Sequence, residues 1–247
     1  MSLTEDIAQL VARTNALLNT FEAKEAAINA AVQAAINGAG TLSREVWVDP
    51  TKGNDANTGL TATTAFLTLD RAIEATAQVP CVTISLLGDV TLRKRVWTNS
   101  VALTIRGMDG VSERNRPIRK ISFAPLANNS PNIYGDTYPA GIEFNARLAL
   151  RADGISIAIP DVPSTTTGKN IFSIYFGVTF TMQAGVLSAD AAATAAVLLG
   201  TWWVSPVELW FSNAQIDASA KGHILGGVAS GGNPNSVVNY RSNATAL

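Results

Sequence analysis

Hydrophobic residues recur at alternating steps of four and three positions along the first 37 residues. This heptad pattern predicts an amphipathic helix with one apolar stripe. Ser2-Leu3-Thr4-Glu5 has the composition of a capping box at its start, and Gly38 and Gly40 are expected to end it. The stripe is interrupted by two polar residues and consists of Leu3, Ile7, Leu10, Thr14, Leu17, Phe21, Lys24, Ile28, Ala31 and Ala35.

We interpret residues 1–37 as an oligomerisation helix, followed by a linker over residues 38–44. A broad apolar stripe favours association of three copies over two. The acidic residues of the helix balance or exceed the basic ones, which argues against a membrane-surface helix. The alternative is a helix that folds back on its own domain. The expected contact residues are Leu3, Ile7, Leu10, Leu17, Phe21 and Ile28.

Residues 45–80 are predicted to form a strand, a polar loop and a short helix. Val46-Trp47-Val48 has the composition of a strand. Thr68 is suited to cap a helix that begins at Leu69, and Pro80 ends this segment.

The loop within this segment resembles an ion site in composition but not in spacing. Asp55, Asn57 and Gly59 match a fragment of an EF-hand loop, whose closing glutamate is missing. No Gly-Lys-Ser/Thr sequence follows that would bind phosphate. We therefore interpret its Gly, Asn and Asp residues as turn formers, and we expect no metal and no cofactor. The alternative is an adventitious Ca²⁺ at Asp49, Asp55 and Asn57.

From residue 81 onward, short stretches of alternating apolar residues are separated by turn residues. Examples are residues 82–86, 101–105, 148–150, 178–180 and 207–211. Such strands fit a β-sandwich and a β-helix equally well. The last stretch, residues 226–247, is rich in Gly, Asn and Ser and reads as a tail.

The spacing of residues 46–75 resembles the N-terminal cap of right-handed parallel β-helix proteins of the pectate-lyase-like class, a motif common in phage tailspikes and tail fibres. The matching residues are Asp49, Gly53, Asn54, Asp55, Gly59, Leu60, Ala65, Phe66, Leu69, Ala72 and Ile73. The resemblance implies a mainly β fold: a trimeric coiled coil, a cap over residues 45–80 with a capping helix, and a short parallel β-helix over residues 81–247.

Composition narrows the class of partner. Charged residues make up 15% of the chain and the net charge is −1, so no overall field attracts nucleic acid or a membrane surface. The single cysteine, Cys81, excludes an intramolecular disulfide. No apolar run reaches the roughly 20 residues of a membrane span, and the N-terminus lacks a signal-peptide pattern, so we expect a soluble protein.

Catalysis of glycoside cleavage would need two facing carboxyl groups. Two pairs could lie on adjacent strands, Glu143 with Asp153 and Glu208 with Asp217, but neither spacing implies that the two carboxylates face each other. The only histidine, His223, is interpreted as a local hydrogen-bonding residue.

Two groups of residues are candidates for ligand binding. The first is a basic run with a local charge of +6, which could meet an anionic saccharide or a lipopolysaccharide phosphate. It contains Arg93, Lys94, Arg95, Arg106, Arg114, Arg116, Arg119 and Lys120. A solvated loop or a contact with another protein is the alternative. The second is the aromatic group Trp202, Trp203 and Trp210, where an exposed ring could stack on a sugar.

Together these features predict a homotrimeric structural fibre or spike of a bacteriophage virion that recognises a host-surface polysaccharide without catalysis. Its N-terminal helix would bind tail, baseplate or capsid proteins. The protein would be made in the host cytoplasm and act at the outer surface of the bacterium. The alternatives are a tailspike depolymerase that cleaves capsular or O-antigen polysaccharide, and a decoration fibre without a ligand.

Overall fold

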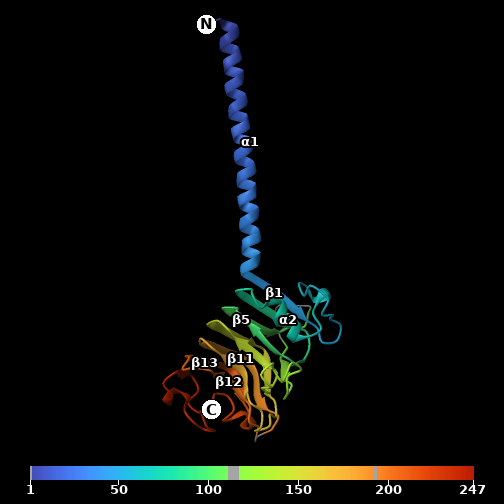
Figure 1. Cartoon of the computed structure of the whole chain (residues 1–247), viewed down its shortest axis with the longest axis vertical. Helices are drawn as coiled ribbons and strands as arrows, with labels where there is room; N and C mark the ends of the chain where they lie inside the picture. The colour runs from blue at the N-terminus through green and yellow to red at the C-terminus, as the bar shows by residue number, and fades with distance from the viewer. Residues whose placement is uncertain (1, 111–116, 192–193) are drawn as a thin grey trace. The chain divides into compact units, whose positions relative to one another are not determined.

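The chain divides into two compact units, Met1–Leu42 and Ser43–Leu247 (Figure 1). The computed structural model describes residues 2–110, 117–191 and 194–247, except for the side chains of residues 33–41.

The first unit is helix α1 (Leu3–Leu42). The predicted capping box is confirmed: the Ser2 backbone N–H donates to Glu5 Oε2 at 2.7 Å and the Glu5 N–H donates to Ser2 Oγ at 3.4 Å. The helix continues through Gly38 and Gly40, where an end was predicted, because glycine disfavours a helix by only about 1 kcal/mol. No helix in the described part of the chain is both long enough and apolar enough to cross a membrane.

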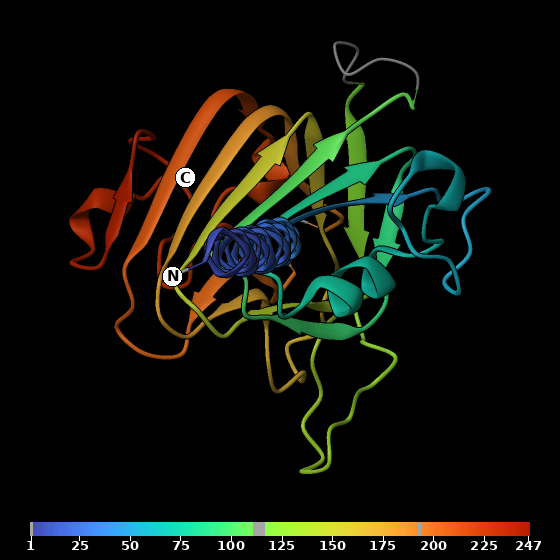
Figure 2. The same ribbon diagram turned by 90° about the horizontal axis from the view of Figure 1, so that it is seen from above.

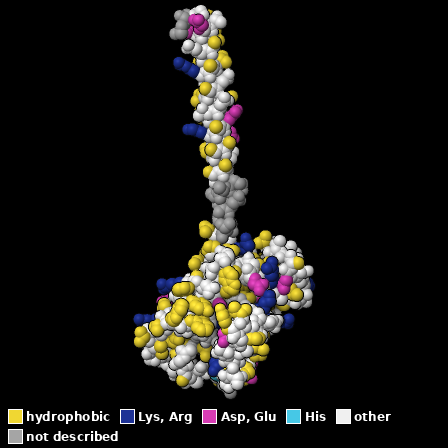
Figure 3. Space-filling view, viewed as in Figure 1, with side chains coloured by type: hydrophobic (Ala, Val, Ile, Leu, Met, Phe, Trp, Pro, Cys, Tyr) yellow, Lys and Arg dark blue, Asp and Glu magenta, His cyan; other side chains and the backbone are white. Residues whose placement is uncertain are grey.

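The predicted contact residues of α1 are all exposed within this unit: Leu3, Ile7, Leu10, Leu17, Phe21 and Ile28. Figure 3 shows hydrophobic side chains along the helix with only a few charged ones between them. The helix therefore has an apolar surface that its own unit does not bury.

The second unit is built on two sheets whose strand pairs are all parallel. Along the ten-stranded sheet the order is β1 (Ser43–Val48), β2 (Cys81–Leu86), β5 (Ala102–Gly107), β8 (Leu148–Asp153), β11 (Val178–Ala189), β9 (Ile155–Ile159), β6 (Arg119–Phe123) and β3 (Val90–Leu92). From β11 the sheet also continues into β13 (Val207–Ile216) and β14 (Tyr240–Ser242). The four-stranded sheet has the order β12 (Val197–Thr201), β10 (Asn170–Ile174), β7 (Gly141–Phe144) and β4 (Arg95–Thr98).

The larger sheet bends at β11. The first part of this 12-residue strand pairs with β8, and Leu187, Ser188 and Ala189 near its end pair with β9. At the bend Ala184 has φ 60° and Gly185 has φ 99°. Gly154 between β8 and β9 (φ 64°) and Asn213 in β13 (φ 52°) lie at corresponding positions of the neighbouring strands. Left-handed residues side by side on adjacent strands turn the whole sheet at one line.

The prediction of a right-handed parallel β-helix with an N-terminal trimeric coiled coil is therefore wrong. The chain is a parallel α/β fold in which eight strands, from β1 to β3, follow one curled sheet like a half-barrel. The described residues contain two α-helices, α1 and α2 (Leu69–Thr76), besides the 3₁₀ turns η1 (Ala62–Thr64), η2 (Ala218–Ala220) and η3 (Pro234–Ser236). The solenoid was inferred from residues 46–75, and a local strand–turn–helix motif does not determine how later strands pair.

The core lies between the two sheets. Phe144 of β7 and Phe172 of β10 face Phe123 of β6 and Phe180 of β11, and all four are buried. The ring of Phe172 lies 5.8 Å from Phe123, 5.6 Å from Phe144 and 6.4 Å from Phe180, centroid to centroid. These distances are those of favourable aromatic packing, so the four rings fix the smaller sheet against the larger one. Figure 2 shows the loop between β6 and β7 (yellow-green) extending away from the sheets.

The polar loop of residues 49–67 is a turn structure, as predicted. Asp49 Oδ1 accepts hydrogen bonds from the N–H groups of Thr51 and Lys52 at 2.8 and 2.9 Å. Asp55 Oδ1 accepts from the N–H groups of Leu67 and Thr68, both at 2.9 Å. Within the described residues, no cluster of three or more His, Cys, Asp or Glu side chains could hold a metal ion.

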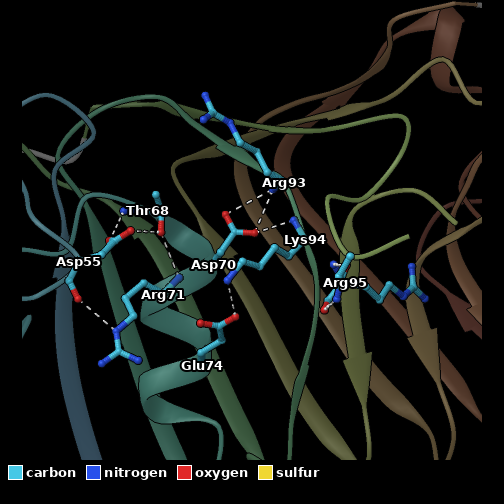
Figure 4. Close-up of polar contacts among 9 residues, drawn as sticks. Asp55, Thr68, Asp70, Arg71, Glu74, Arg93, Lys94 and Arg95 are labelled. Carbon is cyan, nitrogen blue, oxygen red and sulfur yellow. Dashed lines mark hydrogen bonds and ion pairs between the residues drawn. The ribbon is translucent and has the colours of Figure 1, made fainter. Parts of the chain in front are cut away.

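Helix α2 follows this loop and contacts β4 of the four-stranded sheet. Thr68 caps the helix as predicted, its side chain accepting from the Arg71 N–H at 3.2 Å. Asp70 Oδ1 accepts from the backbone N–H groups of Arg93 and Lys94 at 3.0 and 2.7 Å (Figure 4). Burial raises the pKa of Asp70, and these two hydrogen bonds oppose the shift. Asp70 thus fixes the chain just before β4 begins at Arg95.

Candidate functional site

A cavity of about 460 Å³ lies on the outer face of the four-stranded sheet. The parallel register places Trp97 of β4 opposite Glu143 of β7, and Glu143 opposite Ser173 of β10. Because alternate residues of a strand face the same side, Phe144 and Phe172 enter the core while Glu143 and Ser173 face outward. The remaining lining residues are Arg95, Asn129, Asn132, Asp136, Tyr138, Thr167, Gly168, Asn170, Tyr175 and Trp202.

Arg95 forms the floor of this cavity. Its guanidinium extends across β7 to β10, which is possible because its register partner on β7 is Gly141. Nε donates to Glu143 Oε1 at 3.1 Å, Nη1 donates to the Asn170 carbonyl at 2.5 Å, and Nη2 donates to Ser173 Oγ. The side chain of Arg95 is 8% exposed.

Burial lowers the pKa of the Arg95 guanidinium, and the charge of Glu143 opposes that shift. A buried guanidinium with a carboxylate partner stays charged, since arginine is not deprotonated in proteins. The ring of Tyr138 covers it at 5.8 Å from Cζ to the ring centroid, a cation–π distance. Arg95 therefore joins three of the four strands and holds Glu143 at the cavity.

The loop between β6 and β7 supplies one wall. Asn129 brackets the backbone of Arg95: its Oδ1 accepts from the Arg95 N–H and its Nδ2 donates to the Arg95 carbonyl, both at 2.9 Å. Asn132 Oδ1 accepts from the Asp136 N–H at 2.9 Å, and its Nδ2 donates to Asp136 Oδ2 at 3.2 Å. These contacts place the Asp136 carboxylate in the same cavity as Glu143.

Aromatic rings form the opposite wall. The rings of Tyr175 and Trp202 are stacked, with centroids 6.0 Å apart and planes inclined by 8°. Trp203 meets Tyr175 edge-on at 6.1 Å. Trp202 is 56% exposed and Trp97 is 44% exposed, so both rings offer apolar surface to a ligand. Burial raises the pKa of Tyr175, with the charge of Glu143 adding to the shift and that of Arg95 opposing it, so the phenol is protonated at neutral pH.

The four carboxylates considered for catalysis are not brought together. Glu143 lies in the cavity, whereas Asp153 is on β8 of the larger sheet, where Arg151 pairs with it at 3.4 Å. Glu208 of β13 accepts from Thr179 Oγ1 at 3.1 Å. Asp217 lies beyond the other end of β13 and caps η2, accepting from the Ser219 N–H at 2.9 Å, which lowers the pKa of Asp217.

The basic run is dispersed. Lys94 pairs with Glu74 at 3.0 Å, Arg95 is in the cavity floor, and Arg106 pairs with Glu45 at 2.6 Å. Arg119 donates to the Met108 carbonyl at 2.9 Å, while Arg93 and Lys120 are exposed. Arg114 and Arg116 lie outside the described residues.

Of the predicted aromatic residues, Trp202 lines the cavity and Trp203 contacts its wall, while Trp210 lies on β13 of the larger sheet. His223 Nδ1 donates to the Ala196 carbonyl at 3.2 Å, so this hydrogen bond spans 27 residues of the chain and is not the local one predicted. Sequence reasoning did not identify Trp97, Tyr138 or Asn129. The alternation Arg95-Val96-Trp97-Thr98 would have placed Trp97 beside Arg95 on the outer face.

Comparison of the chain with protein-family models, with curated proteins and with solved structures finds no match.

The passage of Arg95 over Gly141 gives a testable prediction. A Cβ at Gly141 would lie 2.0 Å from the Ile171 carbonyl oxygen and 2.7 Å from Arg95 Nη1. The substitution Gly141→Ala should therefore displace the guanidinium and lower the free energy of unfolding by about 1–3 kcal/mol. Urea denaturation of the intact chain measures this change.

Gly226→Ala is the matched control, because a Cβ there has no heavy atom nearer than 3.9 Å among those described. Its unfolding free energy should stay within about 0.5 kcal/mol of the unsubstituted chain. Equal stabilities for the two variants would contradict the placement of Arg95.

Proposed function

We propose that this cavity binds a saccharide. The observation that carries the proposal is the stacked pair Tyr175–Trp202, with Trp97, at a cavity that also holds two carboxylates. A sugar ring has apolar C–H faces that pack on aromatic rings, and hydroxyl groups that need fixed hydrogen-bond partners at its edge. The volume of about 460 Å³ is in the range of small-molecule sites, roughly 300–1,000 Å³.

Arg95 acts as a positioning residue in this proposal. The hydrogen bonds of its guanidinium go to protein acceptors, namely Glu143, Asn170, Ile171 and Ser173. Glu143 Oε1 is occupied by Arg95, while Oε2 has no hydrogen-bond partner among the described residues and can accept from a sugar hydroxyl. A preformed and rigid partner of this kind favours binding because little side-chain freedom remains to be lost.

The setting that we propose is a bacteriophage particle, on which the chain would attach to a polysaccharide of the bacterial host. Support comes from the resemblance of residues 46–75 to phage tail proteins and from the apolar surface of α1. The chain would form a homotrimer to which the exposed apolar residues of α1 contribute contacts, and other virion proteins would bind the same helix. The protein would then act at the outer surface of the host.

A second candidate function is cleavage of that polysaccharide. The observation that favours it is the presence of two carboxylates, Glu143 and Asp136, in one cavity. Glycoside hydrolysis uses such a pair as acid and as base or nucleophile. Binding alone requires no bond cleavage and is the function that we favour, because the aromatic wall and the buried Arg95 account for the site without a reaction.

Substitution of the exposed rings tests saccharide binding. Trp202→Ala or Trp97→Ala should weaken binding about tenfold, which corresponds to about 1.4 kcal/mol, because each removes a stacking surface. The intact chain is first applied to an array of bacterial surface polysaccharides and neutral oligosaccharides, and the best ligand is then titrated by calorimetry. Analysis of the same samples for new reducing ends or unsaturated products distinguishes cleavage from binding.

Trp210→Ala is the matched control, since Trp210 is similarly exposed (49%) but lies on β13, away from the cavity. Its affinity should be unchanged. The proposal fails if no saccharide binds, or if all three variants lose affinity equally. Product that forms with the unsubstituted chain and is lost in Glu143→Gln would favour the enzymatic function instead.

Association of copies is tested by sedimentation of the full chain. The double substitution Leu10→Asn and Leu17→Asn removes apolar surface from the stripe and should shift a trimer to a monomer. Ala12→Asn with Ala16→Asn is the control, because at 100° per residue these positions lie on the opposite side of the helix. A monomeric unsubstituted chain, or equal dissociation of both double variants, would rule out self-association through this stripe.

A further inference from the structure

We infer that the saccharide of this cavity is neutral or carries an amino group, and that acidic saccharides are excluded. The inference rests on the proposed function and specifies its ligand class. It differs from what the basic run suggested, which was an anionic partner.

The charges at the cavity are the first argument. Its described lining contains one cation, Arg95, and two carboxylates, Glu143 and Asp136, which together give a net charge of −1. A second hollow of about 390 Å³ shares Arg95, Trp97 and Asn129 with the cavity and adds Glu74. Lys94, which precedes Arg95 in the chain, is turned toward Glu74 and pairs with it at 3.0 Å (Figure 4). A ligand along both hollows therefore meets no unpaired cation in the described lining.

The direction of the hydrogen-bond donors is the second argument. A sugar carboxylate is bound best by a guanidinium that offers two parallel N–H groups. Arg95 donates instead to Glu143, Asn170 and Ser173 and is 8% exposed. Each amide nitrogen of the wall also gives one of its two N–H groups to the protein, since Asn129 donates to the Arg95 carbonyl and Asn132 donates to Asp136.

The acceptors that remain are the third argument. Glu143 Oε2 and Asp136 Oδ1 have no hydrogen-bond partner within the described part of the chain. Both can accept from a hydroxyl or from a sugar ammonium group. A carboxylate or sulfate of a ligand would face them across a partly desolvated space, where repulsion between like charges is stronger than in water. The aromatic rings contribute only neutral donors, the Tyr175 hydroxyl and the indole N–H groups.

The test uses matched saccharides and the full chain. Acidic bacterial polysaccharides and pectic oligomers are compared with the same materials after chemical reduction of their carboxyl groups to alcohols, and chitosan oligomers serve as the amino-sugar probe. The reduced or amino forms should bind at least about tenfold more tightly than the acidic forms, the factor for one unfavourable ion contact.

A charge variant tests the cause of the preference. Asp136→Asn removes one negative charge from the cavity and should improve the binding of acidic forms about threefold or more, while Asp190→Asn, an exposed position outside the lining, should not change it. Tighter binding of acidic forms by the unsubstituted chain would overturn this inference and leave saccharide binding intact. Binding of no saccharide at all would instead overturn the proposed function and the inference with it.

Discussion

The burial of the Arg95 guanidinium is the interaction on which the candidate site depends. One side chain from β4 crosses Gly141 on β7 and reaches the Asn170 carbonyl and Ser173 on β10. A charge removed from water is strongly unfavourable unless it is paired and fully hydrogen-bonded. Glu143 therefore stays beside Arg95, and Asn129 holds the backbone at the same point. This one arrangement forms the floor of the cavity and places Glu143 as one of its acceptors. It also attaches the loop between β6 and β7, which forms one wall.

Parts of the fold that lie outside the cavity support this arrangement of Arg95. The bend through Gly154, Ala184 and Asn213 curls the larger sheet, so that Phe123 and Phe180 meet the inner face of the smaller sheet. With the inner face filled by aromatic rings, alternation leaves the outer face for polar and aromatic side chains. Asp70 fixes the chain where β4 begins. The site is thus built on strands, which position side chains more accurately than loops do.

Local features could be predicted from the sequence, and long-range ones could not. The capping box at Ser2, the Thr68 cap and strands such as residues 82–86 depend on neighbouring residues, and the structure confirms them. The β-helix was wrong because it was inferred from residues 46–75, which do not show that Ala184 and Gly185, far later in the chain, bend a continuous β11. Arg95 was predicted as part of an exposed basic run, because a sequence does not show that a glycine 46 positions later lies under its side chain. Glu143 and Trp202 were identified singly, but the loop that completes their cavity was not.

Amide hydrogen exchange with and without a bound saccharide tests the central claim most directly, namely that the outer face of the four-stranded sheet is the binding site. The account predicts slower exchange at residues 95–98, 127–145, 167–175 and 200–204, and unchanged exchange along β13 (Val207–Ile216). Protection confined to the ten-stranded sheet, with none on β4, β7 or β10, would contradict it.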